Sequence, residues 1–239
     1  MLEGFLAVPL HFTIELLGFV VCAGAAALLV SRPGLVPGGT FARLAAALGF
    51  AVLAAAQVLH GGAFTEAETD GARLLVLIHA SGFALLAAAL LGSSSSVPAV
   101  SVREPLLFVP AGIAGLVAIL ALGRSRGPGF GALTRLALGA LLLGAADALT
   151  ALAPRATFGL GSVSPYAYAA HGVKLLGFVA VGAWVWTGVR SSIRSRFVAT
   201  FAALLLVVIL ALSTSLTAVI SDNVGDAQLA TVQTQLDAQ

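Results

Sequence analysis

Long apolar stretches separated by short polar breaks dominate the pattern of hydrophobic and polar positions along this chain. The stretches are continuous over roughly 20 residues instead of alternating over roughly 10, so they predict membrane-spanning helices and not the strands of a barrel. The predicted fold class is therefore all-α, a polytopic membrane helix bundle with about seven transmembrane helices. The seven predicted spans run at Ala7–Val30, Phe41–Gly61, Leu74–Gly92, Pro105–Gly123, Leu133–Ala153, Tyr166–Arg190 and Phe197–Ala218.

Composition leads to the same class. Hydrophobic residues make up 59% of the 239 residues, charged residues make up 9%, and the mean hydropathy is +1.06. A soluble domain carries about 25% charged residues, so the chain is predicted to be an integral membrane protein. The formal net charge of +2 gives no reason to expect a nucleic-acid partner. The single cysteine, Cys22, excludes a disulfide framework within the chain.

The chain is predicted to contain two parts. Residues 1–190 form a six-span membrane domain, and residues 191–239 form a basic juxtamembrane segment, the seventh span and the start of an extracytoplasmic or linker helix. If the spans alternate in direction, more arginines lie on the side of the N-terminus than on the other side, which predicts a cytoplasmic N-terminus and an extracytoplasmic C-terminus in a multi-pass protein of the cell membrane. The seven arginines on the N-terminal side are Arg73, Arg124, Arg126, Arg135, Arg190, Arg194 and Arg196, and the four on the other side are Arg32, Arg43, Arg103 and Arg155.

A faint internal duplication is visible. The segment from Arg43 to Gln57 resembles the segment from Arg135 to Asp147, and His79 in the third span falls near the place of His171 in the sixth. Three alternating spans per unit would orient the two halves oppositely, so a true duplication would make the bundle a 3+3 inverted repeat plus one further span.

All four histidines lie within the predicted spans or at their rims, where an ionisable side chain is costly and marks a candidate functional site. His11, His60 and His79 are expected to approach one membrane face, with Glu15 and Gln57 as supporting polar groups. Three imidazoles and a carboxylate can ligate copper or zinc, and two imidazoles from facing helices can hold haem b. The alternatives are a pocket for quinone or another small ligand, and polar packing without a ligand.

A second cluster, Asp147, His171 and Lys174, is expected near the opposite membrane face. His171 and Lys174 are three residues apart and share one face of a helix. Asp147 on the neighbouring span is the carboxylate that can pair with Lys174. A buried Asp147–Lys174 pair that fixes helix packing is the leading interpretation, with a proton relay or an anion site as the alternative.

Two family resemblances bear on function. The basic segment from Arg190 to Phe197 and the apolar segment after it resemble the first span of prokaryotic sensor kinases and chemotaxis transducers, over about Arg190 to Asn223. The six earlier spans resemble membrane-associated input domains of signalling proteins. Leu10-His11-Phe12-Thr13 is similar to the Met-His-Tyr-Thr motif of MHYT domains, a resemblance that implies copper binding and gas sensing through His11.

The leading hypothesis is a non-catalytic membrane input domain of a signal-transduction protein. It would sense a small ligand, a gas or the redox state within the bilayer, through haem or copper bound by His11, His60 and His79. The first alternative is a haem-b subunit that exchanges electrons with quinone, and the second is a small inverted-repeat transporter. The expected partners are the lipid bilayer, a small-molecule ligand or quinone, and a second copy of the chain in a homodimer.

Overall fold

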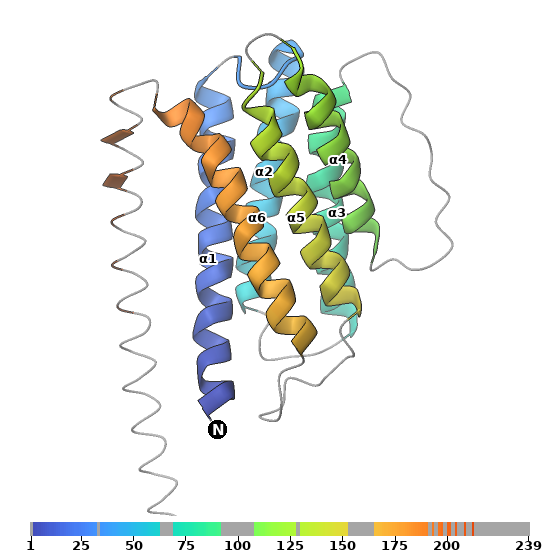
Figure 1. The fold of residues 1–239 in the computed structure, drawn as a ribbon, viewed down its shortest axis with the longest axis vertical. Helices are drawn as coiled ribbons and strands as arrows, with labels where there is room; N and C mark the ends of the chain where they lie inside the picture. Colours follow the sequence, from blue (N-terminus) through green and yellow to red (C-terminus); the bar gives the residue numbers. More distant parts are fainter. Residues whose placement is uncertain are drawn as a thin grey trace, which may run out of the picture. The chain divides into compact units, whose positions relative to one another are not determined.

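The computed structural model describes residues 2–32, 34–62, 69–91, 108–127, 130–152 and 165–190, with isolated positions between 193 and 212. Side chains are described within 11–32, 34–60, 74–91, 108–127, 130–151 and 168–190. The described residues form six helices and no strand (Figure 1), namely α1 Leu2–Ser31, α2 Gly39–Gly62, α3 Thr69–Leu91, α4 Val109–Ser125, α5 Leu133–Leu152 and α6 Pro165–Val189.

The all-helical prediction is confirmed for this part of the chain, whereas the predicted seventh span, Phe197–Ala218, lies largely outside the described residues. The chain divides into two compact units, Met1–Arg196 and Phe197–Gln239. The six helices all belong to the first unit.

Each apolar stretch forms a helix, and turn residues separate the helices. The connection from α1 to α2 contains three glycines with positive φ, Gly34 at 91°, Gly38 at 112° and Gly39 at 73°. A side chain would be strained at these angles, so the sequence places glycine there. Pro110 lies in the first turn of α4, where its missing N–H group costs no hydrogen bond.

Five of the helices are long and apolar enough to cross a membrane, and α4 is shorter with 17 residues. Many large apolar side chains are exposed on the outside of the bundle, among them Phe41, Leu48, Leu77, Ile119 and Leu141. In water such a surface would be unfavourable, whereas lipid tails solvate it well. The chain is therefore consistent with a multi-pass membrane protein in contact with the bilayer.

The six helices pack in a ring in chain order, and α6 closes the ring against α1. These two helices are parallel, because Gly18 lies against Phe178 and Gly188, further along α6, lies against Leu28. The ends of α3 and α4 also lie together, since Nη2 of Arg124 donates a hydrogen bond to the carbonyl oxygen of Leu91 over 2.9 Å. Thus α3 and α4 run in the same direction (Figure 1), and α1–α3 and α4–α6 form two halves of the same orientation.

The inverted repeat predicted from the sequence is therefore wrong. The prediction assumed that every span reverses the direction of the one before it, but α4 runs in the same direction as α3. As a consequence, α5 and α6 also run opposite to the directions that were expected. The two halves are related as a parallel repeat, whose axis runs along the bundle.

The hairpins α2–α3 and α5–α6 pack through corresponding residues, which supports an internal repeat. In each hairpin, a glycine of the first helix lies against the carbonyl oxygen of a glycine of the second helix. The glycine of the second helix lies against a leucine that is one turn further along the first helix. A Cβ atom on any of these glycines would lie within about 3 Å of the facing helix, so the backbones approach closely. The corresponding residues are Gly49, Gly82 and Leu53 in the first hairpin and Gly139, Gly177 and Leu143 in the second.

The centre of the bundle is filled by aromatic and small apolar side chains. The rings of Phe50 and Trp184 stack with centroids 5.5 Å apart and planes at 17°, and both residues are 1% exposed. This stack joins α2 to α6 across the ring, so the two halves share one core.

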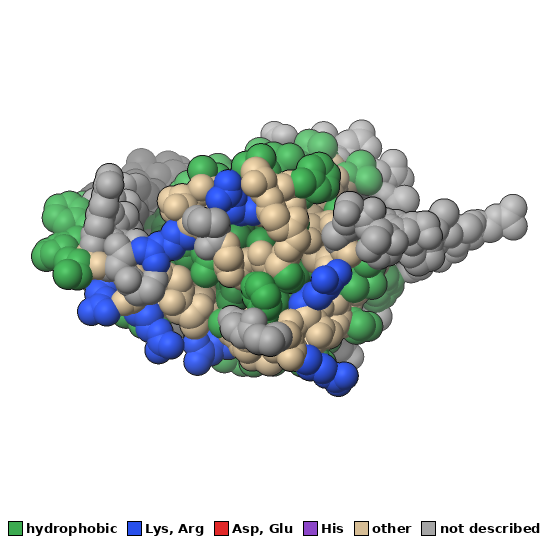
Figure 2. Space-filling model, turned by 90° about the horizontal axis from the view of Figure 1, so that it is seen from above, with side chains coloured by type: hydrophobic (Ala, Val, Ile, Leu, Met, Phe, Trp, Pro, Cys, Tyr) green, Lys and Arg blue, Asp and Glu red, His purple; other side chains and the backbone are tan. Residues whose placement is uncertain are grey.

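Most described arginines gather at one end of the bundle, where α1, α3, α4 and α6 end and α2 and α5 begin. Figure 2 views this end and shows arginine side chains around it, with no acidic side chain among the residues that the structure describes there. We call it the arginine end, and its arginines are Arg32, Arg43, Arg124, Arg126, Arg135 and Arg190. Four of these six were expected on the side of the N-terminus, so the arginine count no longer supports a cytoplasmic N-terminus.

Candidate functional site

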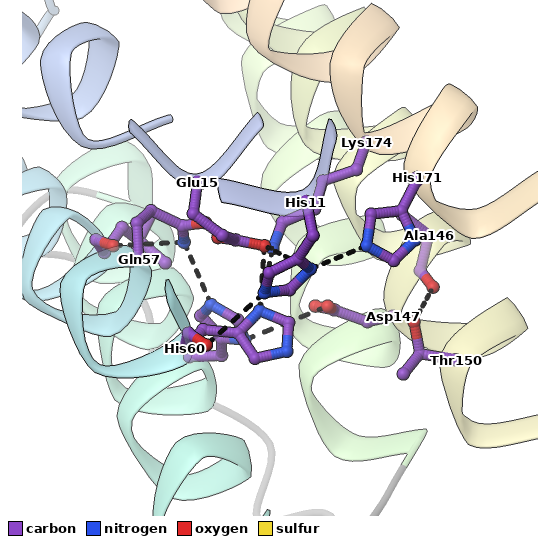
Figure 3. Close-up of polar contacts among 11 residues, drawn as sticks. His11, Glu15, Gln57, His60, Ala146, Asp147, Thr150, His171 and Lys174 are labelled. Carbon is purple, nitrogen blue, oxygen red and sulfur yellow. Dashed lines mark hydrogen bonds and ion pairs between the residues drawn. The ribbon is translucent and has the colours of Figure 1, made fainter. Parts of the chain in front are cut away.

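Eight polar side chains from five helices meet inside the bundle, toward the end opposite the arginine end. Figure 3 shows their contacts. The prediction of two clusters at opposite membrane faces is wrong, because α5 and α6 run opposite to the expected direction. We call this group the polar cluster, and its members are His11 and Glu15 of α1, Gln57 and His60 of α2, His79 of α3, Asp147 of α5, and His171 and Lys174 of α6.

An ion pair between Glu15 and Lys174 forms the centre of the polar cluster. Nζ of Lys174 lies 2.5 Å from Oε1 of Glu15, and the two side chains are 11% and 2% exposed. The expected partner of Lys174 was Asp147, but the ammonium group instead bonds to the carboxylate of α1. Because the pair is almost fully buried, each charge depends on the other for its stabilisation.

His60 completes a triangle with this pair. Its Nδ1 atom lies 2.9 Å from Oε1 of Glu15 and 3.2 Å from Nζ of Lys174. Oε1 thus faces two donors, whereas Oε2 of Glu15 is buried without a hydrogen-bond partner among the described residues. The carboxylate therefore retains capacity to bind a further cation or water molecule.

His11 and His171 contact each other directly across the α1–α6 contact. Nδ1 of His11 lies 2.7 Å from Nε2 of His171, while Nε2 of His11 donates to the carbonyl oxygen of His60 over 3.4 Å. If Nε2 of neutral His11 carries the proton, its Nδ1 accepts a hydrogen bond from His171. His11 thereby connects α1 to both α2 and α6.

Gln57, His79 and Asp147 form the other side of the polar cluster. Nε2 of Gln57 donates to the carbonyl oxygen of Leu53 over 3.2 Å and lies 3.1 Å from Nε2 of His79. An imidazole nitrogen that accepts from Gln57 leaves the proton on Nδ1, which lies 3.8 Å from Oδ1 of Asp147. This contact joins α3 to α5, and so connects the two halves of the bundle.

The free space beside the polar cluster is too small for haem or quinone. The cavity lined by Gln57, His79, Asp147 and Lys174 has a volume of about 10 Å³, roughly the space of one water molecule. The described residues therefore do not fit a haem group.

A single metal ion fits the donor set better. One ligand atom from each of His11, Glu15 and His60 lies within 4.8 Å of the other two. Nδ1 of His11 and Nδ1 of His60 lie 3.9 Å and 2.9 Å from Oε1 of Glu15, and these distances bracket the spacing of about 3.3 Å between ligand atoms of tetrahedral zinc. This set differs from the predicted His11, His60 and His79, because His79 instead contacts Gln57 and Asp147.

Two residues beside the polar cluster are missing from the predicted set. The ring of Phe178 lies 5.9 Å from Nζ of Lys174 and packs against Gly18, where any side chain would collide with the ring. The signal in the sequence is the helical spacing, since Gly18 follows Glu15 by three residues and Phe178 follows Lys174 by four. Together they cover the ion pair on the side of the apolar core.

No protein-family model, curated protein or solved structure matches the chain. The function must therefore be argued from the polar cluster itself.

Proposed function

We propose that the bundle is a membrane input domain of a signal-transduction protein and that its input is a divalent transition-metal ion bound by His11, Glu15 and His60. The observation that supports this proposal is the buried polar cluster, which connects five helices through one ion pair and a few hydrogen bonds. In such a network, a change of charge at one position alters the packing of several helices at once.

The ammonium group of Lys174 occupies the position that a metal ion would need. It lies against both Oε1 of Glu15 and Nδ1 of His60, which are two of the three ligand atoms. Like-charge repulsion would drive the ammonium group away when a divalent ion binds. Metal binding and the Glu15–Lys174 ion pair therefore exclude each other. The domain would thus have two states, one with the ion pair and one with the metal ion.

The exchange would change the contact between α1 and α6. In the described state Lys174 ties α6 to Glu15 of α1. The metal-bound state would keep the link between α1 and α2 through His60 and would release Lys174. We propose that this shift of α6 relative to α1 is the signal that the domain transmits along α6.

We further propose that the arginine end faces the cytoplasm, which reverses the orientation expected from the sequence. Six of the described arginines mark this end, and arginine-rich ends of short loops remain inside. The N-terminus and the polar cluster would then lie toward the outside. His60, whose side chain is 33% exposed, would provide the route by which an external ion reaches Glu15.

Orientation can be tested with a membrane-impermeant thiol reagent. In a Cys22→Ala background, Arg126→Cys should be labelled only after the cells are opened, and Leu2→Cys should be labelled in intact cells. The reverse labelling pattern would contradict the proposed orientation.

Metal binding and the helix shift can be tested on the full chain in lipid nanodiscs. Isothermal titration with Zn²⁺ and Cu²⁺ should show one site, and Glu15→Gln should weaken binding by at least about tenfold, since a ligand is lost. His79→Gln is the matched control and should retain the wild-type affinity. Spin labels on α1 and α6 should report a metal-dependent change of distance. Absence of saturable binding to the wild-type chain would contradict the proposal.

A transporter is the second candidate, and the parallel repeat favours it. Transporters built from repeated halves place charged binding residues where the halves meet, as the Glu15–Lys174 and His79–Asp147 contacts do here. Metal flux into proteoliposomes distinguishes the two functions. Uptake that is lost in Glu15→Gln would favour transport, whereas binding without flux would favour the input domain.

A further inference from the structure

A cleft opens at the arginine end, away from the polar cluster. It has a volume of about 440 Å³ and lies between the α1–α2 turn, the start of α5 and the last turns of α6. Its walls are residues 34–35, residues 130–135, and Trp184, Thr187 and Arg190. The cleft is far larger than the space of about 10–15 Å³ that one water molecule needs, so it can admit a polar group of several atoms.

Two guanidinium groups are the charged groups of this cleft. Arg135 at the start of α5 and Arg190 at the end of α6 both line it and are both exposed. Among the described side chains the acidic ones are Glu15 and Asp147, and both belong to the polar cluster near the opposite end. The positive charge of the cleft is therefore not balanced by a carboxylate in the described part of the chain.

The hydroxyl groups of the cleft already donate hydrogen bonds within the protein, whereas the guanidinium groups retain N–H donors for a ligand. The hydroxyl group of Thr187 donates to the carbonyl oxygen of Trp184 over 2.6 Å, and that of Thr134 donates to Gly131 over 2.7 Å. Arg135 donates one N–H to the carbonyl oxygen of Ala183 over 3.4 Å, and a guanidinium group carries five such donors. A ligand with several acceptor oxygens and negative charge would match these donors.

We propose that this cleft binds a phosphate group, which Arg135 and Arg190 grip from two sides. A phosphate group has enough oxygen atoms to accept hydrogen bonds from both guanidinium groups at once, whereas a single carboxylate has only two oxygen atoms. The cleft lies where the helices end, at the level at which the headgroups of phospholipids are found. The phosphate can therefore come from an anionic lipid headgroup or from a soluble phosphate, and the two sources share the same recognition chemistry.

The test compares two lipids that differ only in the phosphate, using the purified full chain in detergent. Isothermal titration should show saturable binding of dioctanoyl phosphatidic acid and none of dioctanoylglycerol. The double variant R135Q/R190Q should weaken the binding of phosphatidic acid by at least about tenfold. R126Q is the matched control, because Arg126 is exposed at the same end but does not line the cleft. R126Q should stay within about twofold of the wild type, since screened surface charges contribute little.

Further measurements identify the source and protect the test against misfolding. Competition by millimolar inorganic phosphate would indicate a soluble ligand, and binding of phosphatidic acid that inorganic phosphate does not displace would indicate a lipid; either result supports the phosphate site. R135K/R190K keeps both charges but loses the guanidinium fork, and should bind more weakly than the wild type while unfolding at the same temperature. Equal losses in R126Q and R135Q/R190Q, or equal binding of the two lipids, would overturn the proposal.

Discussion

Removal of the Lys174 ammonium group should destabilise the bundle strongly, and removal of its partner as well should restore most of the loss. In Lys174→Met the carboxylate of Glu15 stays buried at 2% exposure and keeps the hydrogen bond with His60. Methionine keeps the length and the apolar stem of lysine, so the change mainly removes the charge. The expected result is therefore an electrostatic effect and not a packing effect.

The magnitude follows from the geometry of the pair. At 2.5 Å and an effective dielectric constant of about 20, the attraction between two unit charges is about 7 kcal/mol. Part of it is offset by the desolvation of both groups, and breaking a buried pair by removing one partner costs about 3–5 kcal/mol. Glu15→Gln/Lys174→Met leaves no buried charge at this position, so we expect it to unfold within about 1 kcal/mol of the wild type.

The double-mutant cycle is measured as the free energy of unfolding in mixed detergent and SDS, with Arg126→Gln as an exposed control that should change it by less than about 0.5 kcal/mol. Two results would refute the reasoning. Lys174→Met within about 1 kcal/mol of the wild type would mean that the pair contributes little. Additive losses in the double variant would mean that the two charges do not interact.

Three further predictions test the fold and the metal site. Gly82→Leu should destabilise the α2–α3 hairpin by about 1–3 kcal/mol or more, because even a Cβ atom would lie 2.7 Å from Leu53, whereas Gly24→Ala, with open space around it, should be neutral in the same unfolding experiment. Phe50→Ala should cost about 3–5 kcal/mol of unfolding free energy through loss of the stack on Trp184. His11→Ala should weaken Zn²⁺ binding in nanodiscs by about 10–100-fold, and unchanged affinity would exclude His11 as a ligand.

The helices could be predicted from the sequence because length and hydropathy determine them. The stretches expected at Phe41–Gly61 and Leu133–Ala153 became α2, Gly39–Gly62, and α5, Leu133–Leu152, with ends that differ by two residues or fewer. The direction of each helix could not be predicted in this way. An apolar stretch has the same composition read along either direction, so direction rested on the assumption of strict alternation, which fails between α3 and α4.

The polar residues of the cluster could likewise be found, but their pairing could not. Each ionisable side chain within an apolar stretch was a candidate functional residue, because such a side chain is energetically costly inside a membrane. The partner of Lys174 depends on which helices are neighbours and on their directions, and both changed when α6 proved parallel to α1. The sequence itself could not have corrected the error. Leu48-Gly49 and Leu138-Gly139 stand at the same distance before Gln57 and Asp147, which indicates a repeat, but a parallel and an inverted repeat would show the same spacing.

The repeat also shows where the two halves have diverged, and the divergence falls on the polar cluster. If the hairpins are aligned on the contact between their glycines, Gln57 corresponds to Asp147 and His79 corresponds to Lys174. The apolar contacts are the same in both hairpins, whereas these two polar positions differ in charge. Packing alone would be satisfied by identical neutral residues at both places, without the desolvation of a buried ammonium group and carboxylate. The asymmetry is therefore the strongest argument that the polar cluster serves a function beyond holding the helices together.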